Sequence, residues 1–323
     1  MHAAALLAVC VPAPALAQSA PAAEQTRDPY PLEIFQSRED RLFQIGYRLA
    51  TANAPFCERT VPTLGLLIHD ARSYGNASIV RQLFGLAGDI GVQSAALGSP
   101  AYAAGLRQNA TLVQVDGEDI ETRWLPGKEG FERPTAIRNW MDDALTRGPV
   151  TLGWTDRDGT VSSATVAGVP ACQSRFELID SSIGASADGS RVSVGENFPA
   201  FAYTDDEFAA AIAHEMAHNL LGHLDLFEET GRKRQLVRLS ERDADRLMPW
   251  LLHNAGYDPE AAVRFMRQWG PRYGGWIFRK RTHDGWDERV ELIEAELPRV
   301  AAAATANGKA DWKTGFVRLL QPE

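Results

Sequence analysis

The stretch AAAIAHEMAHNLLGH, residues 209–223, constrains the fold most, because it places two histidines four residues apart in an apolar run of helix-forming residues. Residues 204–207 (TDDE) have the form of a capping box and therefore predict the start of a helix. On a helix His214 and His218 lie one above the other, so both imidazoles can reach one Zn²⁺. The alternative is a core helix that carries histidines by chance.

Glu215 follows the first histidine and lies about 100° further around the helix, beside the position of such a metal. A glutamate in that position is placed to act as the general base toward water. A catalytic zinc site also needs a third protein ligand, and it leaves one position for water. The sequence therefore predicts that a second segment contributes a ligand.

The third ligand has two candidate sources. A metzincin would have histidine at position 224, which is Leu224; His223 is one position off, and on a continuous helix it faces roughly the opposite side. We expect His223 to be a supporting or surface residue. In a second predicted helix, residues 239–256, Glu241 and Asp245 are four apart and can both face the histidines. Glu241 would bind the metal, and Asp245 would accept a hydrogen bond from a ligand histidine.

Together these motifs resemble family forty-eight of the metallopeptidases, the gluzincins that include the CAAX prenyl protease. The resemblance is carried by HEMAH (214–218) with the histidine five residues on, by ERDAD (241–245) and by NAGYDPEAAVRFM (254–266). It implies a mainly helical metalloprotease domain with a small β-sheet, within an α+β protein. It also implies one Zn²⁺ per chain on His214, His218 and Glu241, with Glu215 as a catalytic residue.

The segment RTHDGWDERVELIEAEL, residues 281–297, looks like the family's Thr-His-Pro segment, with Asp284 in place of the proline. By that resemblance His283 is a second catalytic residue that donates to the oxyanion, and Arg289 organises the site. The alternative is a histidine and an arginine on a surface helix.

The middle of the chain is rich in short strand-like runs and turn residues. It resembles a bacterial PDZ domain in GSPA (98–101), AGL (104–106) and LVQVDG (112–117). Asn109 stands near the place of the family's glycine, and asparagine tolerates the left-handed conformation that this turn needs. The alternative is an unclassified β-rich insert. A helix at 134–148 and a hairpin at 150–168 follow.

The remaining elements divide the chain. We predict a helix at 32–53, a buried strand at 64–71, strands near 176–181 and 190–203, and helices from residue 204 onward. The predicted parts are a signal peptide, the N-terminal part of the metalloprotease domain, a PDZ-like domain and the catalytic zinc metalloprotease domain, at residues 1–17, 30–84, 85–170 and 171–323.

The first seventeen residues lack Asp, Glu, Lys and Arg and end in a small-x-small site, which is typical of a secretory signal. They also lack the usual basic start, so an alanine-rich tail is the alternative. Export predicts a periplasmic or secreted protein, in which Cys57 and Cys172 pair as a disulfide; two separate buried thiols are the alternative. No later segment is apolar over the length of a membrane span.

The formal charge of −9 argues against a nucleic-acid partner, because such binding depends on neutralising phosphates. The zinc motif, the signal-like start and the PDZ-like segment together predict an exported zinc endopeptidase. Its expected substrates are polypeptides that are unfolded or have exposed C-termini, in envelope quality control. The alternatives are a catalytically silent PDZ-containing adaptor or chaperone that binds peptides, and a purely structural exported protein. The sequence does not fix the oligomeric state.

Overall fold

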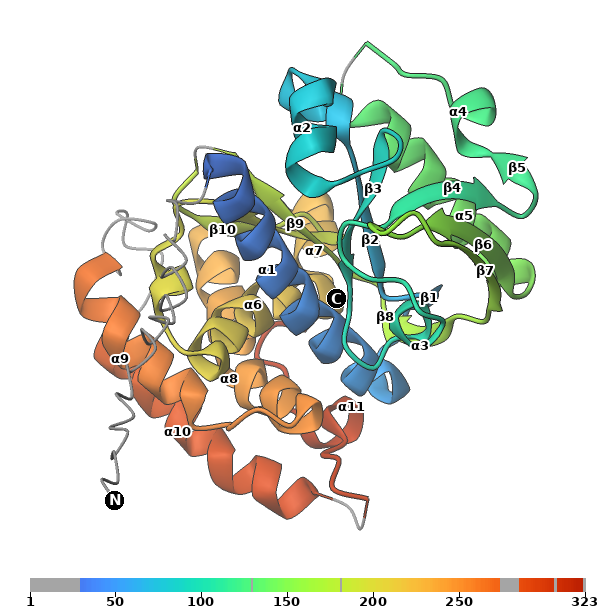
Figure 1. The fold of residues 1–323 in the computed structure, drawn as a ribbon. Coiled ribbons are helices and arrows are strands. Elements are labelled where there is room, and N and C mark those ends of the chain that lie inside the picture. The colour runs from blue at the N-terminus through green and yellow to red at the C-terminus, as the bar shows by residue number, and fades with distance from the viewer. Residues whose placement is uncertain (1–29, 129, 181, 274–284, 305–306, 322–323) are drawn as a thin grey trace, which may run out of the picture.

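The computed structural model describes residues 30–128, 130–180, 182–273, 285–304 and 307–321. It confirms the α+β class, with one hydrophobic core built mainly by helices and another around a six-stranded sheet (Figure 1). Among the described helices, none combines the length and the apolar character that a bilayer span requires. The predicted signal peptide lies outside the described residues.

The helical core is built on two packed helices, α6 (Asp205–Leu220) and α8 (Arg234–Ala255). Three more helices surround them: α1 (Pro31–Asn53), α9 (Ala261–Tyr273) and α10 (Trp286–Ala303). The predicted capping box starts α6, since the Thr204 hydroxyl accepts from the Glu207 amide and the Glu207 carboxylate accepts from the Thr204 amide. Short helical elements complete this part: η1 (Ala54–Phe56), η3 (Pro199–Ala202), α7 (His223–Thr230) and α11 (Trp312–Gly315).

A small three-stranded sheet lies beside α6 and α1. Its order is β10-β11-β9, from strands β10 (Ala185–Ala187), β11 (Arg191–Gly195) and β9 (Arg175–Ile179). Strand β9 confirms the predicted strand near 176–181. The prediction near 190–203 is confirmed only in its first part, by β11, because Pro199–Ala202 form the helical turn η3. β10 was not predicted; it lies between Gly184 and Gly189, in the segment that separates the two predicted strands. In this sheet β10 is an edge strand.

The larger sheet has the order β2-β3-β4-β6-β7, with β5 paired to β4. Its strands are β2 (Leu66–Asp70), β3 (Ile90–Ala95), β4 (Thr111–Val115), β5 (Glu118–Asp119), β6 (Val150–Thr155) and β7 (Val161–Val166). The helical elements α2 (Ala77–Phe84), α3 (Pro100–Ala103), α4 (Ile120–Arg123), α5 (Glu132–Arg147) and η2 (Ala71–Tyr74) complete it. Asn109 has a φ of 69°, the left-handed conformation predicted for it, and β6 and β7 form the predicted hairpin.

Strand β2 extends the sheet toward the N-terminus. It pairs antiparallel with β3, from Leu66 opposite Ala95 to Asp70 opposite Ile90, and α5 packs against it. The second core therefore begins at Leu64. The strand itself was predicted, but it belongs to this sheet although it lies in the segment 30–84 assigned to the other domain. Local sequence indicates a strand and does not identify its partner.

The chain passes between the two parts at one place. Strands β1 (Thr60–Thr63) and β8 (Val169–Cys172) pair antiparallel as a separate ribbon, with Thr60 opposite Cys172 and Thr63 opposite Val169. Cys57 and Cys172 form the predicted disulfide, with Cα atoms 5.6 Å apart. The two crossings are thus held side by side (Figure 1).

Candidate metal centre

Helices α6 and α8 bring three potential metal ligands together. His214 Nε2 lies 3.4 Å from His218 Nε2 and 3.4 Å from Glu241 Oε2, and His218 Nε2 lies 3.6 Å from Glu241 Oε1. All three ligand atoms are within 4.8 Å of one another. Within the described part of the chain, no other set of three His, Cys, Asp or Glu side chains gathers in this way. Two imidazoles and one carboxylate are a donor set that suits zinc and related divalent ions.

Asp245 lies behind the first histidine. Its Oδ1 is 3.1 Å from His214 Nδ1, and its side chain has no exposed surface. Arg289 of α10 donates two hydrogen bonds to the same carboxylate, at 2.6 Å from Nε to Oδ2 and at 2.7 Å from Nη2 to Oδ1. Arg289 is itself buried, so it is not the surface residue of the alternative reading. A third helix therefore helps to orient the imidazole, through a carboxylate.

His223 lies behind the second histidine, so of the two predicted positions, supporting or surface, it takes the supporting one. Its Nδ1 is 2.8 Å from His218 Nδ1, and its side chain is fully buried. The prediction that His223 faces away from His214 is wrong, because α6 ends at Leu220 and does not continue to His223. Gly222 then adopts a left-handed conformation, φ 64° and ψ 34°, which starts α7 in a new direction and returns His223 toward the metal centre.

Glu215 lies beside the ligands in a crevice. Glu215, His214 and Arg289 line its polar side, and six residues that are mostly apolar line the rest: Ala185, Phe198, Ala211, Phe265, Met266 and Trp269. Burial raises the pKa of Glu215 to about 7, because the charged carboxylate loses water there. A carboxyl group with that pKa can both accept and release a proton near neutral pH.

The carboxylates of Asp245 and Glu241 favour a positive charge at His214, even without a metal. Burial opposes protonation of His214, but the hydrogen bonds and charges of Asp245 and Glu241 outweigh it and raise its pKa to about 10. Burial likewise opposes ionisation of Glu241, yet the neighbouring histidines hold its pKa well below the usual range. A proton or a bound cation can supply that charge, so metal binding would release a proton.

The pKa shifts of the remaining groups favour neutral imidazoles at His218 and His223 and an ionised carboxylate at Asp245. Burial lowers the pKa of His218 to about 4. Burial, with smaller contributions from the charges of His218 and Arg318, lowers the pKa of His223 well below its ordinary value. Burial works against the charge of Asp245, but Arg289 keeps its pKa below the usual range. Neutral imidazoles and ionised carboxylates are the forms that bind metals.

The residues singled out from the sequence thus have different outcomes. His214, Glu215, His218, Glu241 and Asp245 lie together, as helical spacing predicted. Arg289 joins them, whereas His283 lies outside the described residues.

Two features of the centre were not predicted. One is the contact of His223, for which the only signal was Gly222 directly before it. The other is the apolar wall of the crevice, whose Phe198 and Trp269 come from segments that local patterns do not connect.

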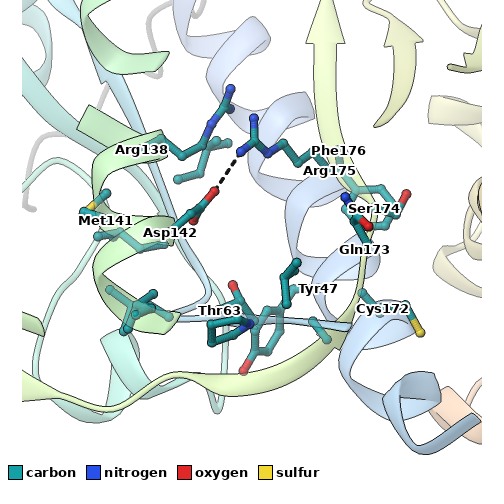
Figure 2. Close-up of a pocket in the computed structure, with 18 of the residues that line it drawn as sticks. Tyr47, Thr63, Arg138, Met141, Asp142, Cys172, Gln173, Ser174, Arg175 and Phe176 are labelled. Carbon is teal, nitrogen blue, oxygen red and sulfur yellow. Dashed lines mark hydrogen bonds and ion pairs between the residues drawn. The ribbon is translucent and has the colours of Figure 1, made fainter. Parts of the chain in front are cut away.

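A larger cavity of about 500 Å³ lies between the two parts of the molecule, bounded by α1, α5, β1, β2 and β9. Figure 2 shows Arg138, Asp142 and Arg175 at one end and Tyr47 and Thr63 at the other. Asp142 accepts a 2.8 Å hydrogen bond from Arg175, and Arg138 pairs with Glu177 at 3.1 Å. These ion pairs bridge the two parts, and they do not form a catalytic set.

Comparison with protein-family models and with curated protein sequences found no match. The resemblances described above therefore depend on the quoted motifs and on the geometry of the site.

Proposed function

We propose that this chain is a zinc-dependent endopeptidase. The observation that carries the proposal is the meeting of His214, His218 and Glu241, together with the crevice that His214 and Glu215 line. The donor set matches that of zinc hydrolases with two histidines and a glutamate. The Cys57–Cys172 disulfide fits an oxidising compartment, such as the periplasm or the extracellular space.

In this proposal the chain's own residues hold the metal and move protons. Zinc held by His214, His218 and Glu241 would supply Lewis-acid activation of water and of the scissile carbonyl. Glu215 would take a proton from the attacking water and pass it to the leaving amine. Asp245, fixed by Arg289, would keep the His214 ring in place through both steps.

The crevice and its rim support a polypeptide substrate. Phe198, Phe265 and Trp269 give the crevice an apolar wall beside Glu215. Ala185 of the edge strand β10 lines the same crevice. An extended polypeptide can pair with such an edge through its main chain, which suits unfolded substrates of varied sequence.

The six-stranded sheet limits where a peptide could dock outside the crevice. One edge of β3 is already paired with β2, against which α5 packs. The Arg133 guanidinium of α5 lies 3.6 Å from the Asp70 carboxylate at the end of β2. Among the described strands, β2 and β7 are the two edge strands of this sheet, each paired with one neighbour, so either edge offers a place for strand addition. Strand β2 also lines, together with α5, the cavity of about 500 Å³. The β7 sequence VSSATV has no charge and no proline to protect its edge.

That uncharged edge favours a second candidate function, a peptide-binding adaptor without turnover. The two candidates differ in their dependence on Glu215. The test measures bound metal and the cleavage of unfolded casein by the parent chain and by Glu215→Gln. We expect about one zinc per chain in both, and activity lowered by roughly 10³-fold or more in the variant.

Glu228→Gln, an exposed change on α7, is the matched control and should retain full activity. Casein cleavage by Glu215→Gln at the parent rate would refute the mechanism. Casein binding without cleavage by the zinc-loaded parent would instead favour the adaptor.

A further inference from the structure

The contact between His223 and His218 is well defined. The two Nδ1 atoms are 2.8 Å apart, the ring centroids are 4.9 Å apart, and the ring planes are inclined by 72°. His223 has no exposed surface, and its Nε2 makes no hydrogen bond within the described part of the chain. Within the residues that the structure describes, the one hydrogen-bond partner of the His218 Nδ1 is this second imidazole.

With a metal bound at the Nε2 of His218, this geometry would determine which nitrogen atoms carry the protons. The Nε2 of His218 points at Glu241 and at the Nε2 of His214, so a metal between them would need its lone pair. A neutral imidazole with a free Nε2 carries its proton on Nδ1. Two nitrogens 2.8 Å apart share one proton, so the Nδ1 of His223 must be the acceptor.

We propose that His223 is a positioning residue that holds His218 in the tautomer and orientation needed to bind the metal through Nε2. The inference rests on the proposed zinc function. It assigns to His223 the role toward His218 that Asp245 has toward His214, but with a neutral acceptor in place of an anion. Outer partners of this kind typically raise metal affinity 10- to 100-fold.

The turn at Gly222 positions His223 for this contact. Gly222 has a φ of 64°, and a Cβ there would meet only Asp225 Oδ2, at 3.9 Å. Glycine is therefore needed for its backbone conformation and not for lack of space. The carbonyl of Leu221 accepts a hydrogen bond from Arg318 in the C-terminal segment, which holds the turn from outside.

The test compares two variants of the full chain, His223→Leu and His223→Asn. Leucine removes the acceptor, whereas the asparagine Oδ1 can take the place of the imidazole Nδ1. Zinc affinity, measured by competition with a chromogenic chelator, should fall about 10- to 100-fold in His223→Leu and stay within about 3-fold of the parent in His223→Asn. Urea unfolding of the metal-free chains separates a folding defect from a loss at the metal centre.

A second measurement needs no variant. Long-range ¹H–¹⁵N NMR of the zinc-loaded parent should show His218 bound through Nε2 and protonated at Nδ1. Binding of His218 through Nδ1, or equal weakening in both variants, would overturn the proposal. Zinc affinity is measured without substrate, so a parent that binds zinc and leaves casein uncut would refute the endopeptidase alone.

Discussion

Two buried histidines, one in each part of the molecule, have opposite properties. His214 and His69 are 7% and 5% exposed. His214 faces two carboxylates and has a pKa raised to about 10, because their attraction exceeds the cost of burial. His69 of β2 lies between the rings of Tyr74 and Phe84, its nitrogens make no hydrogen bond within the described residues, and burial lowers its pKa to about 4. Acidic groups converging on an imidazole, rather than burial, distinguish the candidate metal centre.

The largest effect is expected from removing a carboxylate next to His214, since this would make its surroundings more like those of His69. Asp245→Ala takes the partner of His214 and leaves the buried Arg289 guanidinium without its two-point acceptor. Breaking a buried pair in this way costs about 3 to 5 kcal/mol. We expect that loss in the free energy of unfolding by urea, together with weaker zinc binding.

Asp142→Ala is the matched control, because it breaks an Asp–Arg pair whose side chains are 44% and 38% exposed. Pairs of that exposure contribute less than about 1 kcal/mol. Equal losses in the two variants would contradict the distinction between the buried and the exposed pair.

A second prediction concerns pH and the sheet. His69 has a pKa of about 4 in the folded chain, against 6.5 for an unperturbed histidine. Between these two values the unfolded chain is protonated at His69 and the folded chain is not. The free energy of unfolding is therefore highest above pH 6.5 and falls as the pH is lowered toward 4. The loss amounts to about 3 kcal/mol.

The measurement follows the unfolding free energies of the parent and of His69→Leu from pH 7.5 to pH 4. The difference between the two chains should change over this window, since the variant lacks the titrating ring. Parallel curves for both chains would show that His69 is not the titrating group.

The smallest expected effect tests the turn that positions His223. Gly222→Ala should lower the free energy of unfolding by about 1 kcal/mol, because alanine is strained in the left-handed conformation. Gly184→Ala is the control, since an added Cβ there meets no atom within 4 Å and its φ is not in the left-handed region. A stable Gly222→Ala chain would mean that the turn tolerates side chains.

Local periodicity predicted the parts of the site that lie on single helices. The i,i+4 spacing of His214 with His218, and of Glu241 with Asp245, requires only helical geometry, and the capping residues marked where α6 begins. The His223 contact was missed because one left-handed residue, Gly222, redirects the chain. The pairing of β2 with β3 was missed for a related reason, since a strand's own sequence does not specify which distant strand it joins.

The β1–β8 ribbon brings together the two ends of the segment that forms the six-stranded sheet. Thr63 and Val169 lie opposite each other, so the sheet begins and ends at adjacent points on the helical part. Deleting residues 64–168 and joining the ends with a two-residue turn would leave an ordinary hairpin, closed below by Cys57 and Cys172. Such a deletion would leave the sequences of α6 and α8 intact, and it would uncover the face of α1 that packs on β3 and the residues of β9 that pair with α5.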